Sequence, residues 1–428
     1  MQDIDKSKLA SNVKRLSHLN IVGGGQVVVD GKYAYIGHMD PPHGTTILDV
    51  SDPTDPKIVS QVTLEGDDTH THKVRVVGDL MFTNYEQFNR HFLRKGDALP
   101  DARSKLEASL GRKPSDDELA AEVGGVKAAD IATLDEARER GYHEGGFCIY
   151  DISDRANPKR LCHKRTYGFG VHRFDVDENY AYMSTEMEGY IGNILVVYDY
   201  SDPTDPTEVS RWWMPGQHLA GGETPTWKGY RNRLHHALRV GDEFWASCWH
   251  AGLRVIDASD IKNLKTIGEY DYHPPIPEPS HTFLPLAQTI DGRRIAVAVD
   301  EEHAHIPGRL HAFMWVLDVT DLGDIKPLSI WDLSEMDSPY SRTPGGRFGA
   351  HQFREKMDST LVYLTWFAGG LRIVDVADPT LPKEVGFYIP EPINGFPSPQ
   401  SNDVDVGENG IIYLLDRNAG FDILEFTP

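Results

Sequence analysis

The sequence has little of what binds nucleic acid or builds a disulfide framework. Its 43 lysines and arginines are outnumbered by 65 aspartates and glutamates, giving a formal net charge of −22. That balance disfavours non-specific binding to nucleic acid or anionic membranes, because both need basic patches. The three cysteines form no C-x-x-C motif and no even framework. We expect Cys148 and Cys248, which fall in or beside apolar strands, to be buried thiols.

Long apolar runs are also missing. No run of about 20 apolar residues occurs, so we expect no membrane span. No apolar segment of the signal-peptide type precedes Val22. A cytoplasmic location is therefore the default expectation. Helical patterns are scarce outside one segment of the chain.

One short unit recurs along the chain and decides its predicted architecture. Residues 236–260, HALRVGDEFWASCWHAGLRVIDASD, are typical of three antiparallel strands joined by turns that contain Gly and Asp. The third strand and its turn recur as TTILDVSDPTDP (45–56), FCIYDISDRANP (147–158), LVVYDYSDPTDP (195–206), LRVIDASDIKNL (253–264), MWVLDVTDLGDI (314–325), LRIVDVADPTLP (371–382) and FDILEF (421–426). Length alone would suggest two or three domains. Recurring four-stranded units instead predict an all-β fold, a seven-bladed β-propeller over residues 12–428.

The repeat resembles a known family. LRVID (253–257) and LRIVD (371–375) match the pattern that names the LVIVD-repeat proteins. The resemblance covers nearly the whole chain and implies a propeller. It says little about activity, because propellers carry many unrelated functions and the function must be argued from the site.

The last copy of the repeat lacks its fourth strand. Residues 12–19 resemble the outer strands that begin at Lys57 and Lys383. We expect this N-terminal segment to pair outside 421–426 and complete the last blade, which removes an open sheet edge.

Residues 88–142 depart from the strand pattern. Ser115 and Glu118 form a predicted capping box just before Leu119, and residues 125–141 are also typical of a helix. We expect a helical insertion in blade 2 that acts as a lid or as a homodimer contact. The segment also resembles the helix-turn-helix of bacterial sigma factors, but the acidic balance of the chain disfavours DNA binding.

Nearly all the long connections fall on one face of the predicted propeller. Turns between first and second strands are short, as at Gly78-Asp79 and Gly241-Asp242, whereas segments such as 214–234 and 300–311 belong to the opposite face. Loops on a rigid scaffold commonly carry function, so we expect the site on the long-loop face.

First strands line the central channel of a propeller, and five of the seven begin with histidine. These are His72, His172, His236, His281 and His351, with Gly25 and Asn402 at the remaining two positions. Converging imidazoles suit a transition metal such as Fe, Cu, Zn, Mn or Ni. Because metal–nitrogen bonds are about 2.0–2.1 Å long, only three or four rings can bind one ion. We expect the neighbouring His70 and His235 to be outer groups. The alternative is a repeat that prefers His there for bonds to the backbone or to channel water.

Second strands end near the same mouth and carry acids there. Glu186 and Glu302 are the candidate general bases. The leading hypothesis is a metal-dependent oxidoreductase or oxygenase that acts on a small organic, even aromatic, molecule; by analogy only, seven-bladed carotenoid-cleaving oxygenases hold iron on four histidines. A metal-dependent hydrolase or lyase is the second hypothesis. A non-enzymatic propeller that binds a protein partner is the third, although such a scaffold needs no converging imidazoles.

Overall fold

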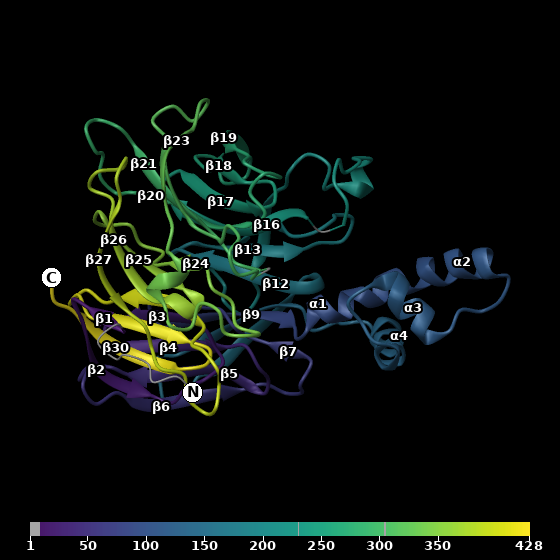
Figure 1. Cartoon of the computed structure of the whole chain (residues 1–428), viewed down its shortest axis with the longest axis horizontal. Coiled ribbons are helices and arrows are strands. Elements are labelled where there is room, and N and C mark those ends of the chain that lie inside the picture. The colour runs from purple at the N-terminus through teal and green to yellow at the C-terminus, as the bar shows by residue number, and fades with distance from the viewer. Residues whose placement is uncertain (1–8, 230, 304) are drawn as a thin grey trace.

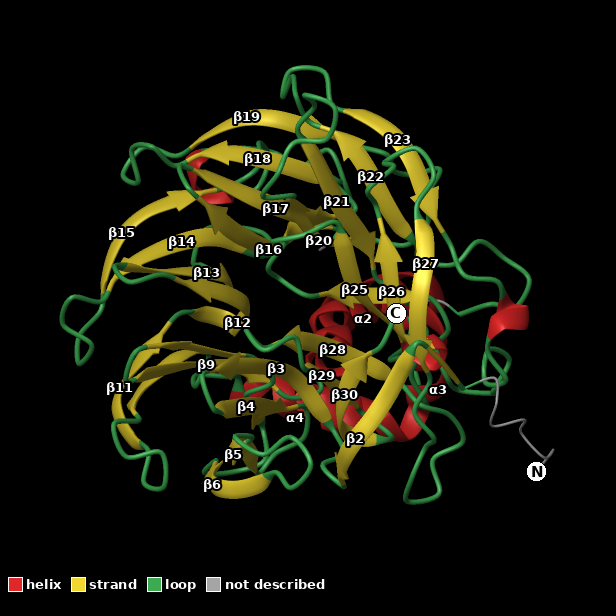
Figure 2. Ribbon diagram, turned by 90° about the vertical axis from the view of Figure 1, so that its left-hand side faces the viewer, coloured by secondary structure: helices red, strands yellow, loops and turns green. Residues whose placement is uncertain are grey.

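The computed structural model describes residues 9–229, 231–303 and 305–428. Its strands pair in antiparallel four-stranded units, here called blades, that follow one another around a central axis (Figure 2). The described strands form seven of these units, and the predicted all-β propeller class is confirmed.

The blades follow the chain in order, each with its first strand nearest the axis. Blade 1 consists of β3 (Gly24–Asp30), β4 (Tyr33–His38), β5 (His43–Asp49) and β6 (Lys57–Thr63). Blade 2 consists of β8 (Val74–Val77), β9 (Leu80–Gln87), β10 (Gly146–Asp151) and β11 (Lys159–Arg165), and the short strand β7 (Thr69–His70) also pairs with β9. Blade 3 consists of β12 (Tyr167–Val176), β13 (Tyr180–Glu186), β14 (Ile194–Asp199) and β15 (Thr207–Trp212). Blades 4 and 5 are β16 (Asn232–Val240), β17 (Glu243–Trp249), β18 (Leu253–Asp257) and β19 (Lys265–Tyr270); and β20 (Ser280–Pro285), β21 (Ile295–Asp300), β22 (Met314–Asp318) and β23 (Lys326–Trp331). Blades 6 and 7 are β24 (Ala350–Phe353), β25 (Leu361–Trp366), β26 (Gly370–Asp375) and β27 (Lys383–Tyr388); and β28 (Ser401–Val406), β29 (Ile412–Asp416), β30 (Gly420–Phe426) and β2 (Val13–Leu19).

The two ends of the chain meet in the last blade. Strand β2 pairs with β30, from Val13 opposite Phe426 to Leu19 opposite Phe421, which is the pairing expected from the missing fourth strand. A short strand that the sequence pattern did not indicate, β1 (Ala10–Ser11), adds to the outer edge of β27. The N-terminal segment thus ties blade 7 to blade 6.

The repeated aspartate has a structural reason. The Oδ1 atom of Asp49 accepts the N–H of Ser51, and Asp257 does the same for Ser259. An aspartate that bonds the backbone two residues further on closes a tight turn. The LVIVD-type pattern therefore encodes an apolar strand buried between neighbouring blades, followed by its own turn.

The helices lie between β9 and β10 and project away from the strands (Figure 1). They are α1 (Arg90–Leu93), η2 (Arg94–Ala98), α2 (Leu99–Leu110), α3 (Asp116–Val123), η3 (Ala128–Asp130) and α4 (Ile131–Arg140). Ser115 and Glu118 form the expected capping box. These helices, residues 90–140, are here called the helical arm. The arm has its own small core, which includes Leu99, Leu119 and Leu134.

Three short 3-10 turns occur elsewhere: η4 (Leu219–Gly221), η5 (Glu335–Asp337) and η6 (Phe367–Gly369). Among the residues described, no helix has both the length and the apolar character needed to cross a membrane.

Candidate metal centre

In most blades the inner strand begins with a β-bulge that leaves one residue out of the ladder. The register shifts across His172 in β12, His281 in β20 and His351 in β24. The same shift occurs across Gly25 in β3 and Asn402 in β28. A bulged residue is left unpaired and its side chain is redirected. The bulges therefore account for the positions of His172, His281 and His351, whereas His72 precedes β8.

Blade 4 differs from the sequence prediction by one residue. The shift in β16 ends at His236, which pairs with Ser247, so His235 holds the position equivalent to His172. His235 lines the cavity at the channel mouth, and His236 is not among the residues that line it. The sequence alignment of HALRV with HRFDV missed this because the connection after β12 is longer: Val176 pairs with Ala181 across four residues, whereas Val240 pairs with Glu243 across two.

Eight histidines line a cavity of about 240 Å³ at this mouth, and six of them form a row. Neighbouring ring centroids are 4.4 Å apart for His70 and His72, 5.3 Å for His72 and His172, and 4.9 Å for His172 and His235. The row continues at 4.2 Å from His235 to His281 and 4.5 Å from His281 to His351. Imidazoles from five consecutive blades thus form one continuous row.

Hydrogen bonds fix the proton position on three of these rings. His235 Nδ1 donates to the carbonyl of His281 at 2.8 Å, and His351 Nδ1 donates to the carbonyl of Asn402 at 2.5 Å. His281 Nδ1 donates to Thr282 Oγ1 at 2.9 Å, because the threonine hydroxyl itself donates to Gln352 at 2.7 Å. In the neutral ring, a proton on Nδ1 leaves a lone pair on Nε2. The Nε2 atoms of these rings could thus bind a metal ion, because outer partners orient metal-binding histidines in the same way.

The contact between His172 and His235 points most directly to a cation. Their Nε2 atoms are 3.1 Å apart. His172 Nδ1 is 3.1 Å from a Glu86 carboxylate oxygen, so its proton lies on that side. Burial lowers the pKa of His172 to about 3 and the pKa of His235 well below its usual value, so both rings are neutral at pH 7. Two lone pairs therefore face one another.

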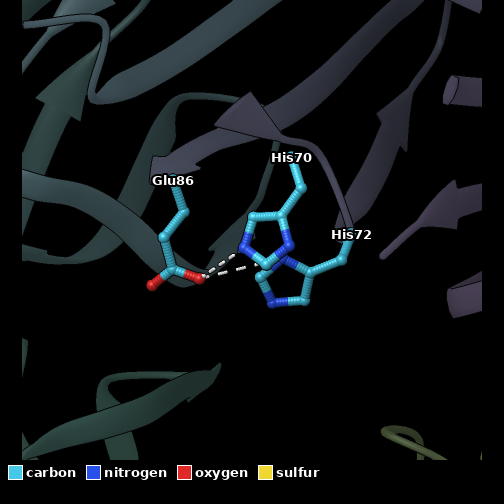
Figure 3. Close-up of side chains that lie close together, drawn as sticks. All are labelled: His70, His72 and Glu86. Carbon is cyan, nitrogen blue, oxygen red and sulfur yellow. Dashed lines mark hydrogen bonds and ion pairs between the residues drawn. The ribbon is translucent and has the colours of Figure 1, made fainter. Parts of the chain in front are cut away.

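His70, His72 and Glu86 lie together at one end of the row (Figure 3). His70 Nδ1 donates to the Met39 carbonyl at 3.0 Å, and its Nε2 is 3.0 Å from Glu86 Oε2. His72 Nδ1 accepts from Asn84 Nδ2 at 3.2 Å. Burial disfavours the Glu86 carboxylate, but Arg90 and His172 outweigh that cost and hold its pKa well below the usual value. Glu86 is thus an anion shared by His70, His172 and Arg90.

Glu301 is the carboxylate at the other end of the row. Its oxygens are 3.1 Å from His303 Nε2, 3.9 Å from His281 Nε2 and 3.7 Å from His351 Nε2. Arg347 Nη1 lies 3.0 Å from the same carboxylate. Donor atoms of His235, His281 and Glu301 lie within 4.8 Å of one another, close enough to hold one ion.

The two acids proposed from the sequence lie elsewhere. Glu186 accepts from the backbone N–H of Phe169 at 3.0 Å and pairs with Arg94, beside a separate cavity. Glu302 is 1% exposed and accepts from Ala312 N–H at 2.7 Å and His311 Nδ1 at 2.8 Å. Neither lines the histidine cavity. Glu301 lines this cavity, and Glu86 contacts two of its histidines, His70 and His172.

A partly buried ion cluster lies beneath the imidazoles. Glu355 binds Arg75, Arg173 Nη2 at 2.5 Å and Gln352 Nε2 at 2.7 Å. His236 Nδ1 lies 3.2 Å from Glu355 Oε1, without hydrogen-bond geometry. Arg173 lines the histidine cavity and Glu355 lines a second cavity of about 600 Å³, so their ion pair separates the two.

Comparisons with known proteins agree with the fold. The LVIVD repeat is identified at residues 24–63, 171–212 and 361–389. No curated protein matches the chain in sequence. Among solved structures, a streptogramin B lyase is 10% identical with a TM-score of 0.52 and covers 99% of each chain. The WD40 β-propeller domain of Doa1 is 9% identical with a TM-score of 0.50 and covers 96% of each chain. A periplasmic gluconolactonase from Pseudomonas aeruginosa is 11% identical with a TM-score of 0.50, covering 89% of this chain and 90% of its own. Similarities at such low sequence identity support the fold only.

Proposed function

We propose that this protein is a metal-dependent enzyme, an oxidoreductase that acts on a small organic molecule in the histidine cavity. The residues that would hold the metal are His172, His235, His281 and His351, through Nε2. The observation that carries the proposal is the 3.1 Å separation of two neutral Nε2 atoms whose rings keep their protons on Nδ1. Without a cation, two lone pairs would face each other in a buried site, which is unfavourable.

The number of prepared imidazoles favours a redox metal over zinc. Four nitrogen ligands would fill the tetrahedral shell of zinc, whose catalytic sites keep only three protein ligands and an open position. Iron and copper also suit imidazole ligands. A redox metal would supply electron transfer to or from the substrate. The expected aromatic character of the substrate has support from Trp249 and Phe88, which also line the cavity.

The protein's own groups have defined tasks in this proposal. Glu86 holds His172 in orientation through Nδ1, and the carbonyls of His281 and Asn402 do the same for His235 and His351. Glu301 is an ionised carboxylate within 4 Å of two Nε2 atoms, and burial is outweighed by His303 in keeping its pKa low. It is the group placed to accept or return a proton.

A metal-dependent hydrolase or lyase is the second candidate. The position of Glu301 favours it, because a carboxylate beside a metal-bound water is the usual general base of such enzymes. The two candidates differ in the metal: redox chemistry needs an ion that changes oxidation state, and hydrolysis does not.

Metal content tests the proposal. Protein purified without a metal-affinity tag is stripped, reconstituted with Fe, Cu, Mn, Ni or Zn, dialysed and analysed for bound metal. The proposal predicts about one ion per chain and a spectrum that changes on reduction for Fe or Cu. Retention of zinc alone would favour the hydrolase or lyase. Absence of any retained metal would leave the imidazoles structural and favour a propeller that binds a protein partner.

A further inference from the structure

The ring of strand-start positions has one sector without imidazole, and two cations reach into it. Blade 7 has Asn402 and blade 1 has Gly25 at these positions. Arg417 Nε donates to Asn402 Oδ1 at 2.7 Å, while Asn402 Nδ2 donates to the Gly25 carbonyl. Lys73 Nζ lies 3.5 Å from that same carbonyl. Arg417 and Lys73 both line the histidine cavity.

Close counter-ions are missing for these cations. Within the described part of the chain, neither Arg417 nor Lys73 has a carboxylate oxygen within 4 Å of its charged nitrogens. Burial, aided by the nearby charge of Arg347, lowers the pKa of Arg417 to about 9, and burial lowers the pKa of Lys73 well below its usual value. Arg173 adds a third cation to the wall, and its buried Nη1 has no hydrogen-bond partner among the described residues.

A buried N–H group without a partner, such as Arg173 Nη1, and a buried cation without a close counter-ion are costly unless an acceptor reaches them. The chain as a whole is strongly acidic, so a cationic wall in this cavity is a local feature. The arginine guanidinium presents a planar fork that matches the two oxygens of a carboxylate or phosphate. The cavity is also smaller than the roughly 300 Å³ at which ordinary ligand pockets begin.

We infer that the histidine cavity binds a small organic oxyanion, with its carboxylate or phosphate group on Arg417 and Lys73 and the rest of the molecule toward the imidazoles. This inference rests on the proposed function, for which it names the substrate class. A metal bound on the imidazoles would add positive charge beside the anion. Metal and anion should therefore strengthen each other's binding, by the same factor in each direction.

Calorimetric titration tests the inference. Benzoate and inorganic phosphate are titrated separately into metal-free and metal-loaded protein, so that the two probes distinguish a carboxylate from a phosphate ligand. The inference predicts binding of at least one probe, tighter in the metal-loaded protein. Arg417→Gln and Lys73→Gln should each raise Kd tenfold or more. Arg417→Lys keeps the charge without the fork and should give an intermediate Kd.

The matched control is Arg239→Gln. Arg239 lines the cavity on the opposite face and pairs with Asp177, so this variant should bind the probe as the wild type does. Circular dichroism confirms that each variant is folded; if Arg417→Gln does not fold, Lys73→Gln carries the comparison.

Failure of the inference and failure of the proposed function give different results. Metal uptake with no binding of either probe, or with a Kd unchanged in the Arg417 and Lys73 variants, would overturn the inference and leave the function standing. Anion binding that depends on Arg417 or Lys73 in a protein that retains no metal would support the inference and remove the function.

Discussion

Replacing His235 and His236 by alanine, one at a time, tests the position of the metal site most sharply. The two residues are adjacent in β16 and both are 1% exposed, yet they face different partners. His235 Nε2 faces His172 Nε2, whereas His236 lies against Glu355 beneath the cavity. We expect His235→Ala to lose metal and His236→Ala to keep it.

The magnitude follows from what each ring contacts. Loss of a partner that merely orients a ligand typically weakens metal binding 10- to 100-fold, and loss of a ligand should cost at least that much, about 1.4–2.7 kcal/mol. His235→Ala also leaves the buried carbonyl of His281 without its donor, which costs about 1 kcal/mol of folding stability. The ring nitrogens of His236 make no hydrogen bond in the described structure, so His236→Ala should cost about 1–3 kcal/mol through packing alone.

Competition with a coloured chelator gives the metal affinity, and thermal melts of metal-free protein give the stability. The expected pattern is a tenfold or greater loss of affinity in His235→Ala and a change of less than twofold in His236→Ala. Loss of affinity in His236→Ala but not in His235→Ala would show that the bulge in β16 does not select the ligand. That result would refute the proposed metal site.

Three further predictions follow from the same geometry. First, metal-free protein should lose stability as the pH falls below about 6.5, because histidines whose folded pKa is lowered take up protons only when unfolded, at about 1.4 kcal/mol per pH unit for each ring; melts between pH 8 and pH 5 that show no slope would contradict this. Second, Glu301→Gln should lower kcat by about 10²-fold or more while metal content stays near the wild type, once a turnover assay exists; equal activity would remove Glu301 from proton transfer. Third, replacing residues 99–140 by a short flexible linker should leave metal affinity intact, whereas Arg90→Gln should weaken it about tenfold by releasing Glu86; metal loss in the linker variant would mean that the whole arm supports the site.

The architecture was predictable because each blade repeats the same physical solution. An apolar strand that ends in Asp is followed by a turn that the aspartate side chain closes, as Asp49 and Asp257 show. Each repeat of this sequence pattern therefore corresponds to one strand and its turn. The pairing of β2 with β30 was predictable for a related reason: a blade of three strands leaves an open edge. Both inferences need only the repeat pattern along the chain and no knowledge of side-chain packing.

The site was only partly predictable, because two details decide which residues form it. One is the bulge in β16, and the other is which of the adjacent acids Glu301 and Glu302 faces the imidazoles. In the sequence, His235 and His236 are equally good candidates, and counting back six residues from the turn at Gly241 would have selected His235, as it selects His72 from Gly78. Nothing comparable separates Glu301 from Glu302. Glu301 faces the imidazoles and Glu302 bonds to the backbone of Ala312, a difference set by how the end of β21 meets its neighbours.

The helical arm has two parts with different surroundings, which the sequence did not reveal: α1 lies at the site, and the outer helices lie away from it. The insertion was expected to act as a lid or as a homodimer contact. Because α2, α3 and α4 project away from the strands (Figure 1), they do not cover them as a lid would, and the homodimer contact stays a prediction. Its first turn belongs to the site instead. Arg90 in α1 follows Glu86 by four residues, pairs with it, and lines the histidine cavity. A residue four positions along a strand-to-helix junction can reach back in this way only if the helix begins where β9 ends. The base of the arm thus fixes the Glu86 carboxylate that orients His172, and the outer helices are free to serve another contact.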